Sequence, residues 1–312
     1  MIWLIGAGGM SIDYAKVLDA QKKDFIVIGR GKSSAKLFEE KTGHNVCAGS
    51  LTVFLSQKPE LPDAAIVSVG VEHLYNATKE LLEYGVKRLL VEKPGGLTFN
   101  EVKQLEEQAI YCKASIYIAY NRRFYSSVAK VLELVELEGG VTSFNFELTE
   151  WSHIIEKLDK SEQAFSKWFI GNSTHVADLA FFLGGKPKDI SCYSAGQLDW
   201  HPASSIFAGA GISDNGALFN YDANWESAGR WSVEVLTNEN RYILRPMESL
   251  QVQARGTIKQ DPVDIDDSLD TKFKPGLYLQ VESFLKNDNK LLCSISEQAL
   301  LFPVYYKMAG YK

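Results

Sequence analysis

The chain has 312 residues, a length that favours two domains over one. With 46% hydrophobic and 23% charged residues, its composition excludes a disordered chain and a small disulfide scaffold. The formal net charge of -6 at pH 7 argues against nucleic acid and anionic membranes as partners.

Neither the N-terminus nor the cysteines point to an oxidising or membrane environment. Residues 1–5 carry no basic segment and no small-residue cleavage site, and no apolar run approaches the length of a membrane span. Cys47, Cys112, Cys192 and Cys293 lie far apart and form no Cys-x-x-Cys pair. We therefore expect a cytoplasmic protein with free structural thiols and no metal site.

In the first 120 residues, short apolar runs alternate with helical patterns, which is typical of βαβ units and a parallel sheet. Gly85 ends one predicted helix, and Thr98 with Glu101 forms a capping box for the next. The predicted buried strands are Ile2–Ile5, Phe25–Ile28, Ala64–Val69, Arg88–Val91 and Ser115–Ala119, with a weaker candidate at Asn45–Ala48. Residues 1–120 thus read as a doubly wound α/β domain.

The pattern changes after Tyr120. A helix at Val128–Leu137 ends at two glycines, and strands with alternating polarity follow, separated by Gly, Asn and Asp. These strands are Phe144–Leu148, Asp189–Ala195, Ile206–Ile212, Ala217–Trp225, Trp231–Leu236 and Arg241–Leu244. Residues 121–312 are predicted to form an α+β domain with a large, mainly antiparallel open sheet, and Pro303 should kink or split the last helix.

A glycine-rich loop directly follows the first strand and opens a helix. In this context it matches the dinucleotide fingerprint: Gly6 makes the tight turn, and Gly8 lets the pyrophosphate approach the backbone. Ser11 stands where Gly or Ala is usual and is small enough for close helix–strand packing. The helix N-terminus would supply donors to the phosphates. The predicted contacts of this loop are Gly6, Gly8, Gly9, Met10 and Ser11.

The end of the second strand carries basic residues where an NAD-binding domain would place Asp or Glu. Arg30, Lys32 and the Ser33 hydroxyl offer charge-assisted donors suited to a 2′-phosphate. We therefore expect NADP(H) as the preferred cofactor, with NAD(H) possible. The alternative is a solvated basic loop.

The fifth strand runs into Glu92-Lys93-Pro94, at the edge of the sheet where ligands of doubly wound folds bind. A lysine with its backbone fixed beside a proline, which can adopt a cis peptide, could aim its amine at a substrate. A surface lysine before a turn is the alternative. Val69, Gly70 and His73, together with Glu92, Lys93 and Pro94, are placed to contact the cofactor.

Four motifs together resemble the glucose-fructose oxidoreductase / inositol dehydrogenase / MocA (Gfo/Idh/MocA) family. They are the Gly6-x-Gly8 loop, Glu92-Lys93-Pro94, Asn121-Arg122-Arg123-Phe124 and His175-x-x-Asp178. The resemblance implies a Rossmann domain, a second domain whose open sheet often forms an oligomer interface, and hydride transfer between nicotinamide and a sugar-like carbon. It assigns catalytic roles to Lys93 and His175. The relay acid that many relatives carry four residues before the histidine is replaced by Gly171.

The residues expected to contact the substrate are Asn121, Arg122, Arg123, Asn172 and His175. Arginine forks suit a carboxylate or phosphate, with a structural ion pair as the alternative, and Asp178 would orient neighbouring groups. We therefore expect an NADP(H)-dependent oxidoreductase acting on a sugar, amino sugar or nucleotide sugar, and a homodimer or homotetramer. The alternatives are an NAD-dependent glycosidase with transient redox chemistry and a non-catalytic dinucleotide sensor or partner subunit.

Overall fold

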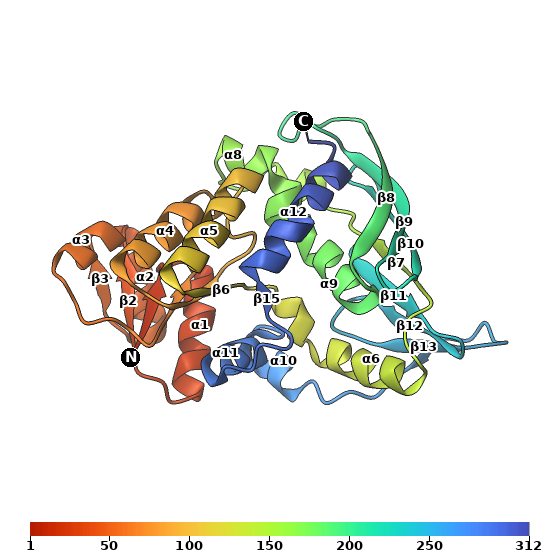
Figure 1. Cartoon of the computed structure of the whole chain (residues 1–312), viewed down its shortest axis with the longest axis horizontal. Coiled ribbons are helices and arrows are strands. Elements are labelled where there is room, and N and C mark those ends of the chain that lie inside the picture. Colours follow the sequence, from red (N-terminus) through yellow and green to blue (C-terminus); the bar gives the residue numbers. More distant parts are fainter. Residues whose placement is uncertain (312) are drawn as a thin grey trace. The chain divides into compact units, whose positions relative to one another are not determined.

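The computed structural model describes residues 1–311, and the chain divides into two compact units (Figure 1). The first unit comprises Met1–Asn121 and Thr271–Leu300; the second comprises Arg122–Asp270 and the residues from Leu301 onward. The sequence analysis placed everything after residue 120 in the second domain, whereas the structure places residues 271–300 in the first unit. This segment supplies a helix and a strand to the first unit, and such long-range pairing leaves no local pattern.

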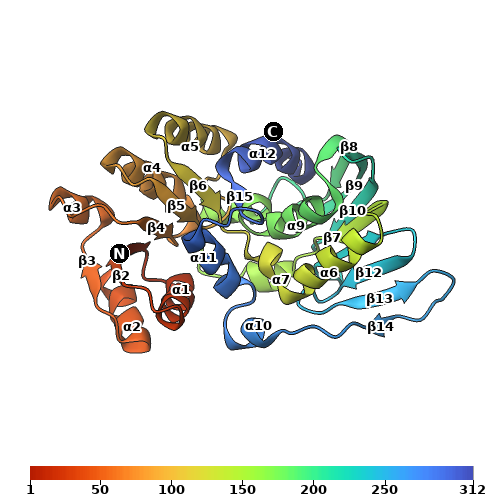
Figure 2. The same ribbon diagram turned by 60° about the horizontal axis from the view of Figure 1, so that its bottom comes forward.

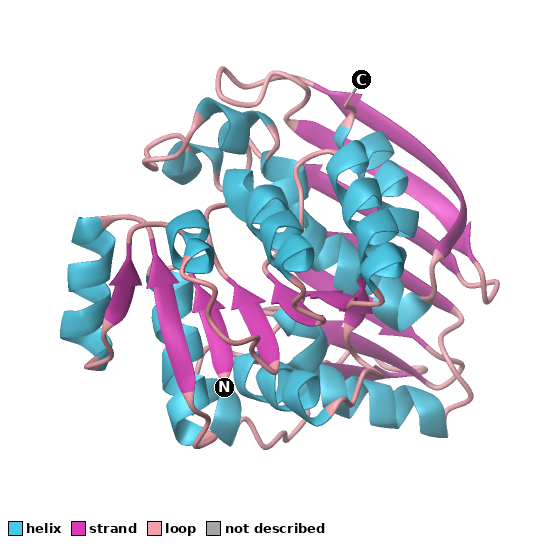
Figure 3. Ribbon diagram, turned by 60° about the vertical axis from the view of Figure 1, so that its left-hand side comes forward, coloured by secondary structure: helices cyan, strands magenta, loops and turns pink. Residues whose placement is uncertain are grey.

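Within the described residues, the first unit holds a seven-stranded sheet in the order β15-β6-β5-β4-β1-β2-β3. All its pairings are parallel except that between β15 and β6. The parallel strands appear as magenta arrows that point the same way in Figure 3. Every side chain of β1 and β4 is buried, as expected for strands covered on both faces. The strands are β1 (Ile2–Ile5), β2 (Phe25–Gly29), β3 (Val46–Ala48), β4 (Ala64–Val67), β5 (Arg88–Val91), β6 (Ser115–Ile118) and β15 (Cys293–Ser294).

Helices cover both faces of this sheet: α1 and α2 lie on one side, and α4 and α5 on the other (Figure 2). The predicted end signals are confirmed, because Gly85 caps α4 with a φ of +113° and Thr98 forms the capping box of α5 with Glu101. The helices are α1 (Gly9–Ala20), α2 (Lys32–Thr42), α3 (Leu51–Ser56), η1 (Val71–His73), α4 (Leu74–Tyr84), α5 (Phe99–Cys112) and α11 (Leu277–Lys286). The predicted doubly wound fold is confirmed.

The second unit is built on an eight-stranded sheet, within the described residues, in the order β14-β13-β12-β11-β7-β10-β9-β8. Only the β7–β10 pair is parallel, so the predicted mainly antiparallel open sheet is confirmed. The strands are β7 (Ser143–Glu147), β8 (Pro187–Ala195), β9 (Ile206–Ser213), β10 (Leu218–Asn224), β11 (Ser232–Leu236), β12 (Asn240–Leu244), β13 (Gln251–Ala254) and β14 (Asp261–Pro262).

Aromatic rings form the core between this sheet and α9. Phe144 stacks on Phe219 at 5.0 Å between ring centres, and Phe146 stacks on Tyr221 at 5.4 Å. Phe181 of α9 meets both phenylalanines of β7 edge-on. The remaining helical segments are η2 (Asn121–Phe124), α6 (Ser126–Leu137), α7 (Ser152–Ile155), α8 (Glu162–Ser166), the π-helix η3 (Phe169–Ser173), α9 (Thr174–Gly184), α10 (Ser268–Lys272) and α12 (Ile295–Ala309).

Two further observations bear on the sequence predictions. The last helix, α12, runs as one element through Pro303, so of the predicted kink or split, the split does not occur. A proline deprives a helix of one backbone hydrogen bond, and packing of the flanking turns can offset that loss: Phe302 and Tyr305 are fully buried. Across residues 1–311, no helix is both long enough and apolar enough to span a membrane.

Candidate functional site

The turn between β1 and α1 has the geometry that its glycines predict. Gly6 has a φ of +119°, and a Cβ there would lie 2.7 Å from the carbonyl oxygen of Ser68. At Gly8 and Gly9 a Cβ would meet no atom within 4 Å. Gly6 is therefore required by the turn itself, whereas the space above the next two glycines is free for a phosphate group to approach the backbone.

Ser11 supports the loop from inside the fold. It is fully buried, its Oγ lies 2.8 Å from the Oγ of Ser68, and it accepts a hydrogen bond from the Gly8 amide at 3.3 Å. The third fingerprint position thus ties the loop to the end of β4, which agrees with the close helix–strand packing expected there.

A cavity of about 440 Å³ opens over the glycine loop within the first unit. Its lining includes these predicted cofactor residues: Gly6, Gly8, Arg30, Val69, Gly70 and His73. It also includes polar residues that the sequence analysis missed: Ser34, Ser50, Thr52, Ser68, Asn76 and Glu80. Of these, Ser50 had a readable signal, because it is the N-cap of α3 and accepts a hydrogen bond from the Val53 amide.

Other predicted cofactor residues lie outside the lining of this cavity, as far as the described chain shows: Gly9, Met10, Ser11, Lys32, Ser33, Glu92, Lys93 and Pro94. Lys32 and Ser33 are exposed in the first turn of α2. Their neighbour Ser34 lines the cavity instead and donates a hydrogen bond to the Gly31 carbonyl at 3.0 Å. Arg30 is exposed at the end of β2, and its Nη2 lies 3.3 Å from Nε2 of His73.

Glu92 connects the end of β5 to α1. Its Oε1 accepts a hydrogen bond from the Tyr14 hydroxyl at 2.7 Å. Burial raises the pKa of the Glu92 carboxyl, while the charge of Lys93 and the Tyr14 hydrogen bond act in the opposite direction. Burial, followed by the Glu92 charge, raises the pKa of Tyr14 well above its usual value. The Tyr14–Glu92 hydrogen bond thus ties the residue before Lys93 to α1.

The backbone that carries Lys93 is held from several directions. The Lys93–Pro94 peptide is cis, and the Gly95 amide donates to the Glu92 carbonyl at 3.0 Å. Gln298, a fully buried residue of α12, donates to the Pro94 carbonyl at 3.0 Å and accepts from the Tyr120 hydroxyl at 3.2 Å. Sequence analysis missed Gln298, because its partners lie about 200 positions earlier in the chain.

In the Asn-Arg-Arg-Phe stretch the three predicted substrate residues differ in their contacts. Asn121, in the first unit, donates its side-chain amide to the Pro275 carbonyl at 2.8 Å. Arg123 is bound through two hydrogen bonds by Asp178, at 2.8 and 2.5 Å. Arg122 contacts aromatic rings, with its guanidinium carbon 4.6 Å from the ring centre of Trp231.

In the second unit, His175 is the second residue of α9 and is 7% exposed. The π-helix η3 precedes α9, and its residues Asn172 and Ser173 both donate to Oε1 of Glu150 at 2.8 Å. Glu150 is 2% exposed and also pairs with Arg230 at 3.5 Å. A Cβ at Gly171 would meet no atom within 4 Å, so the local packing leaves room for the acid that the family pattern places there.

Glu150 is therefore a functional candidate that sequence analysis missed. It follows β7 in chain order, whereas Asn172 and Ser173 lie about 20 residues later. A buried carboxylate holds its hydrogen-bond donors firmly in place, because hydrogen bonds to a charged oxygen are stronger than those to a neutral one. It fixes the turn that leads into the helix carrying His175.

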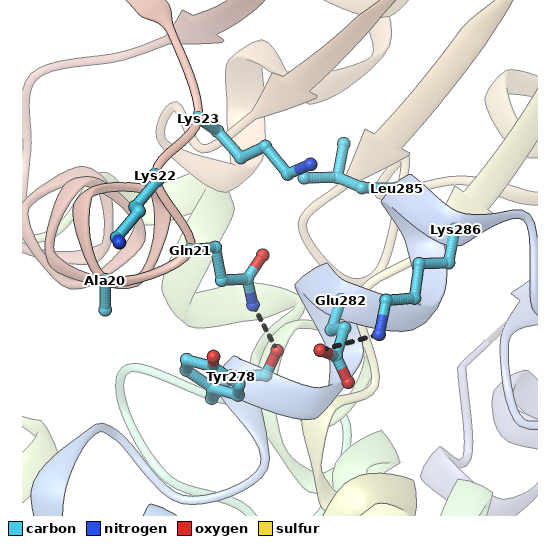
Figure 4. Close-up of a pocket in the computed structure, with 8 residues that line it drawn as sticks. All are labelled: Ala20, Gln21, Lys22, Lys23, Tyr278, Glu282, Leu285 and Lys286. Atoms are coloured by element: carbon cyan, nitrogen blue, oxygen red, sulfur yellow. Dashed lines mark hydrogen bonds and ion pairs between the residues drawn. The ribbon is translucent and has the colours of Figure 1, made fainter.

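Another cavity of the first unit, about 240 Å³, lies where α1 ends and α11 passes (Figure 4). Its polar groups bind one another: Gln21 donates to the Tyr278 carbonyl at 2.9 Å, and Lys286 pairs with Glu282 at 2.9 Å. The glycine loop is at the opposite end of α1, roughly 18 Å away for a helix of this length. No group of three or more metal-ligating side chains occurs among residues 1–311.

Residues 1–118 match the family model GFO_IDH_MocA, described as the oxidoreductase family with an NAD-binding Rossmann fold. A search of curated protein sequences returns no match.

Solved structures are similar over nearly the whole chain. UDP-N-acetylglucosamine 3-dehydrogenase GnnA from Acidithiobacillus ferrooxidans is 15% identical, with a TM-score of 0.77, and the match covers 99% of this chain and 97% of that one. Levoglucosan dehydrogenase in complex with NADH and levoglucosan is 16% identical, with a TM-score of 0.79 and 98% and 95% coverage. The WlbA dehydrogenase from Chromobacterium violaceum, in complex with NADH and UDP-GlcNAcA, is 14% identical, with a TM-score of 0.74 and 99% and 93% coverage.

At these identities the structural likeness establishes the fold, and the family model covers residues 1–118. The family resemblance drawn from the sequence motifs is confirmed over residues 1–118, which match the NAD-binding Rossmann fold of the Gfo/Idh/MocA oxidoreductase family.

Proposed function

We propose that this protein is an NADP(H)-dependent oxidoreductase that transfers hydride between the nicotinamide and a carbon of a sugar, amino sugar or nucleotide sugar. The observation that carries the proposal is the cavity over the open glycine loop, which has the Arg30 guanidinium near the end of β2. The dehydrogenases named above act on a sugar or nucleotide sugar, which supports the substrate class.

The preference for NADP(H) rests on charge at the far end of the cavity. The stretch from Ile28 to Ser34 contains two basic residues and no acid. Arg30 and Ser34 line the cavity, and α2 begins at Lys32 with its backbone amides directed toward its N-terminal end. A 2′-phosphate needs charge-assisted donors, and guanidinium groups and helix N-termini both supply them.

A nicotinamide cofactor held over the glycine loop would supply the hydride chemistry of the proposed reaction, and the protein would handle the accompanying proton. We assign to Lys93 the binding of the reacting hydroxyl and exchange of its proton, and to His175 the second proton-handling role. Gln298 and Gly95 support the Lys93 role by holding the backbone on its C-terminal side. Glu150 supports the His175 role by fixing Asn172 and Ser173 just before it.

A titration of the purified protein with NADPH and NADH, followed by nicotinamide fluorescence, tests the proposal. We expect tighter binding of NADPH and loss of that preference in Arg30→Ala. Lys36→Ala is the matched control, because it removes one positive charge from α2 while leaving the cavity lining intact. Equal affinity for the two cofactors would contradict the NADP(H) assignment, and binding of neither would contradict the function.

A denatured sample should also be assayed for cofactor that co-purifies with the protein. NAD(H) retained tightly through purification would favour a glycosidase that recycles its cofactor, and an exchangeable NADPH favours the dehydrogenase. A homo-oligomer formed through the open sheet stays a prediction.

A further inference from the structure

The Arg122 side chain is partly buried, and its guanidinium contacts aromatic rings. Its central carbon lies 4.6 Å from the ring centre of Trp231 and 6.0 Å from that of Tyr125. Its Nε is buried and has no hydrogen-bond acceptor among residues 1–311, and no carboxylate of the described chain lies within ion-pair distance of the group. Burial lowers the pKa of the Arg122 guanidinium, so the charged form is held in an unfavourable environment.

The next residue shows how this fold treats a structural arginine. Arg123 is 2% exposed, and its Nε and Nη2 both donate hydrogen bonds to the Asp178 carboxylate. Such pairing is the rule for buried arginines, because an unmatched buried charge is costly. Arg122 has no equivalent partner within the part of the chain that the structure describes, so its partly buried guanidinium is open to a ligand.

A second donor lies beside the first. Trp231 is 7% exposed, and its indole Nε1 is buried with no acceptor among the described residues. The guanidinium of Arg230 also lies 4.6 Å from the Trp231 ring centre, so two cations flank one indole. Both arginine and indole N–H groups only donate hydrogen bonds. Nε of Arg122 and Nε1 of Trp231 are thus two neighbouring donors that lack an acceptor among the described residues.

The two carboxylates near Arg122, those of Glu150 and Glu248, bind other groups. Glu150 pairs with Arg230 at 3.5 Å and accepts from Asn172 and Ser173, so its oxygens are occupied. Glu248 accepts a hydrogen bond from Tyr125. The charges of Tyr125, Glu248 and Glu150 raise the pKa of Arg122, against the larger effect of burial, which lowers it. Arg230 is thus matched by a carboxylate, and Arg122 is the cation left for a ligand.

The position of the cluster connects it with the proposed chemistry. The ring centre of Trp231 lies 6.3 Å from that of His175. A group held by Arg122 and the indole would therefore lie near the proposed proton-handling histidine, His175. Two donors carrying one net positive charge suit an oxyanion better than a neutral hydroxyl, which must also donate.

We propose that Arg122 and the indole Nε1 of Trp231 bind an oxyanion of the substrate, so that the substrate is an acidic sugar: a sugar carboxylate or a sugar phosphate ester. This inference rests on the proposed function for its catalytic context, and it specifies the substrate class of that site. A carboxylate and a phosphate both offer anionic oxygens to these two N–H donors, and the experiment below distinguishes them.

The test compares acidic sugars with a neutral one, using intrinsic tryptophan fluorescence and thermal shift, with and without saturating NADPH. The probes are glucuronate, glucose 6-phosphate, UDP-glucose and glucose. We expect at least one acidic probe to bind about tenfold or more tightly than glucose, as charge-assisted pairs imply. A response to glucuronate alone identifies a carboxylate, and a response to the phosphate esters identifies a phosphate.

Arg122→Met keeps the packing against Trp231 and removes the charge and the donors. In this variant the preference for the acidic probe over glucose should disappear, while NADPH binding stays unchanged. The control is Arg255→Met, which removes an exposed arginine of the same unit. Binding of no acidic probe more tightly than glucose in the wild type, or a preference that survives in Arg122→Met, overturns the proposal.

The two proposals fail in different ways. Loss of NADPH binding would refute the oxidoreductase assignment, and the preference for acidic probes would still be measurable in cofactor-free protein. Normal NADPH binding without that preference would refute only the oxyanion site.

Discussion

Arg123 and Asp178 form a buried ion pair with two hydrogen bonds. Nε of Arg123 donates to Oδ2 at 2.8 Å and Nη2 donates to Oδ1 at 2.5 Å, and the two side chains are 2% and 1% exposed. The pair joins η2 to α9, one helical turn after His175. The acid of the His-x-x-Asp motif therefore holds an arginine in place, and we retain Arg122 alone of the two arginines in the proposed substrate site.

Breaking this pair should strongly destabilise the protein. Asp178→Asn leaves the Arg123 charge buried without its counter-charge, which costs about 3–5 kcal/mol. Urea unfolding would measure the loss. The double variant Arg123→Met with Asp178→Leu removes both charges and should recover most of it. A single variant as stable as the wild type would show that the pair has no such role.

Gly8 and Gly6 should respond differently to alanine. Gly8 has a φ of -93°, and a Cβ there meets open space, so Gly8→Ala should keep the unfolding midpoint and weaken NADPH binding by about tenfold or more. Gly6→Ala places a Cβ 2.7 Å from a backbone oxygen at a φ of +119° and should lower stability as well. Thermal unfolding and cofactor titration on both variants check this. Unchanged NADPH affinity in Gly8→Ala would remove the loop from the binding site.

Lys93→Ala should abolish turnover while NADPH affinity stays within a few-fold. The proton that accompanies the hydride loses its proposed carrier, a loss of roughly 10²–10⁴-fold in kcat. Lys93→Arg is the matched control, because it keeps the charge while its guanidinium stays protonated, so it should bind substrate and turn over slowly. Steady-state kinetics on an identified sugar measures both variants. Wild-type activity in Lys93→Ala would exclude the proposed mechanism.

Gln298→Leu should lower kcat and leave NADPH binding intact. The Pro94 carbonyl would lose the donor that holds it at 3.0 Å, and a small displacement of a catalytic group costs about 10- to 100-fold. Leu300→Ala, at a 62% exposed position of the same helix, is the control. A parallel fall in stability and cofactor affinity would point to a general structural role instead.

His201 should make stability depend on pH. It is fully buried, its Nδ1 lies 2.7 Å from the Ser204 carbonyl, and its Nε2 lies 2.8 Å from the Tyr311 hydroxyl. A carbonyl only accepts, so Nδ1 carries the proton and Nε2 accepts from Tyr311. Burial lowers the pKa of the imidazole below its usual value, with Lys167 acting in the same direction.

The direction in which stability changes with pH follows from the lowered pKa of His201. The unfolded chain takes up the proton near pH 6.5, before the folded chain does, so the His201 contribution is present above that pH and is lost as pH falls through the folded pKa. We expect the unfolding midpoint of the wild type to fall more steeply below pH 6.5 than that of His201→Gln. Parallel curves would show that His201 does not titrate in this way.

The local patterns predicted much of the architecture. Continuous apolar runs such as Ile2–Ile5 indicated buried parallel strands, and alternating runs such as Phe144–Leu148 indicated a half-buried sheet, because side-chain periodicity reports how many faces are covered. The glycine loop, the Glu-Lys-Pro turn and the His-x-x-Asp motif were readable because each is contiguous in the chain. Together they indicated the family.

Contacts between distant segments were decided only by the tertiary structure. Glu150 meets Asn172, Gln298 meets Pro94, and 271–300 return to the first unit, and none of these leaves a periodic signal. The same holds for adjacent Arg122 and Arg123, which are the same residue type with different partners. Local sequence determines backbone preference and which face is buried, whereas the partner of a buried polar group depends on which elements pack together.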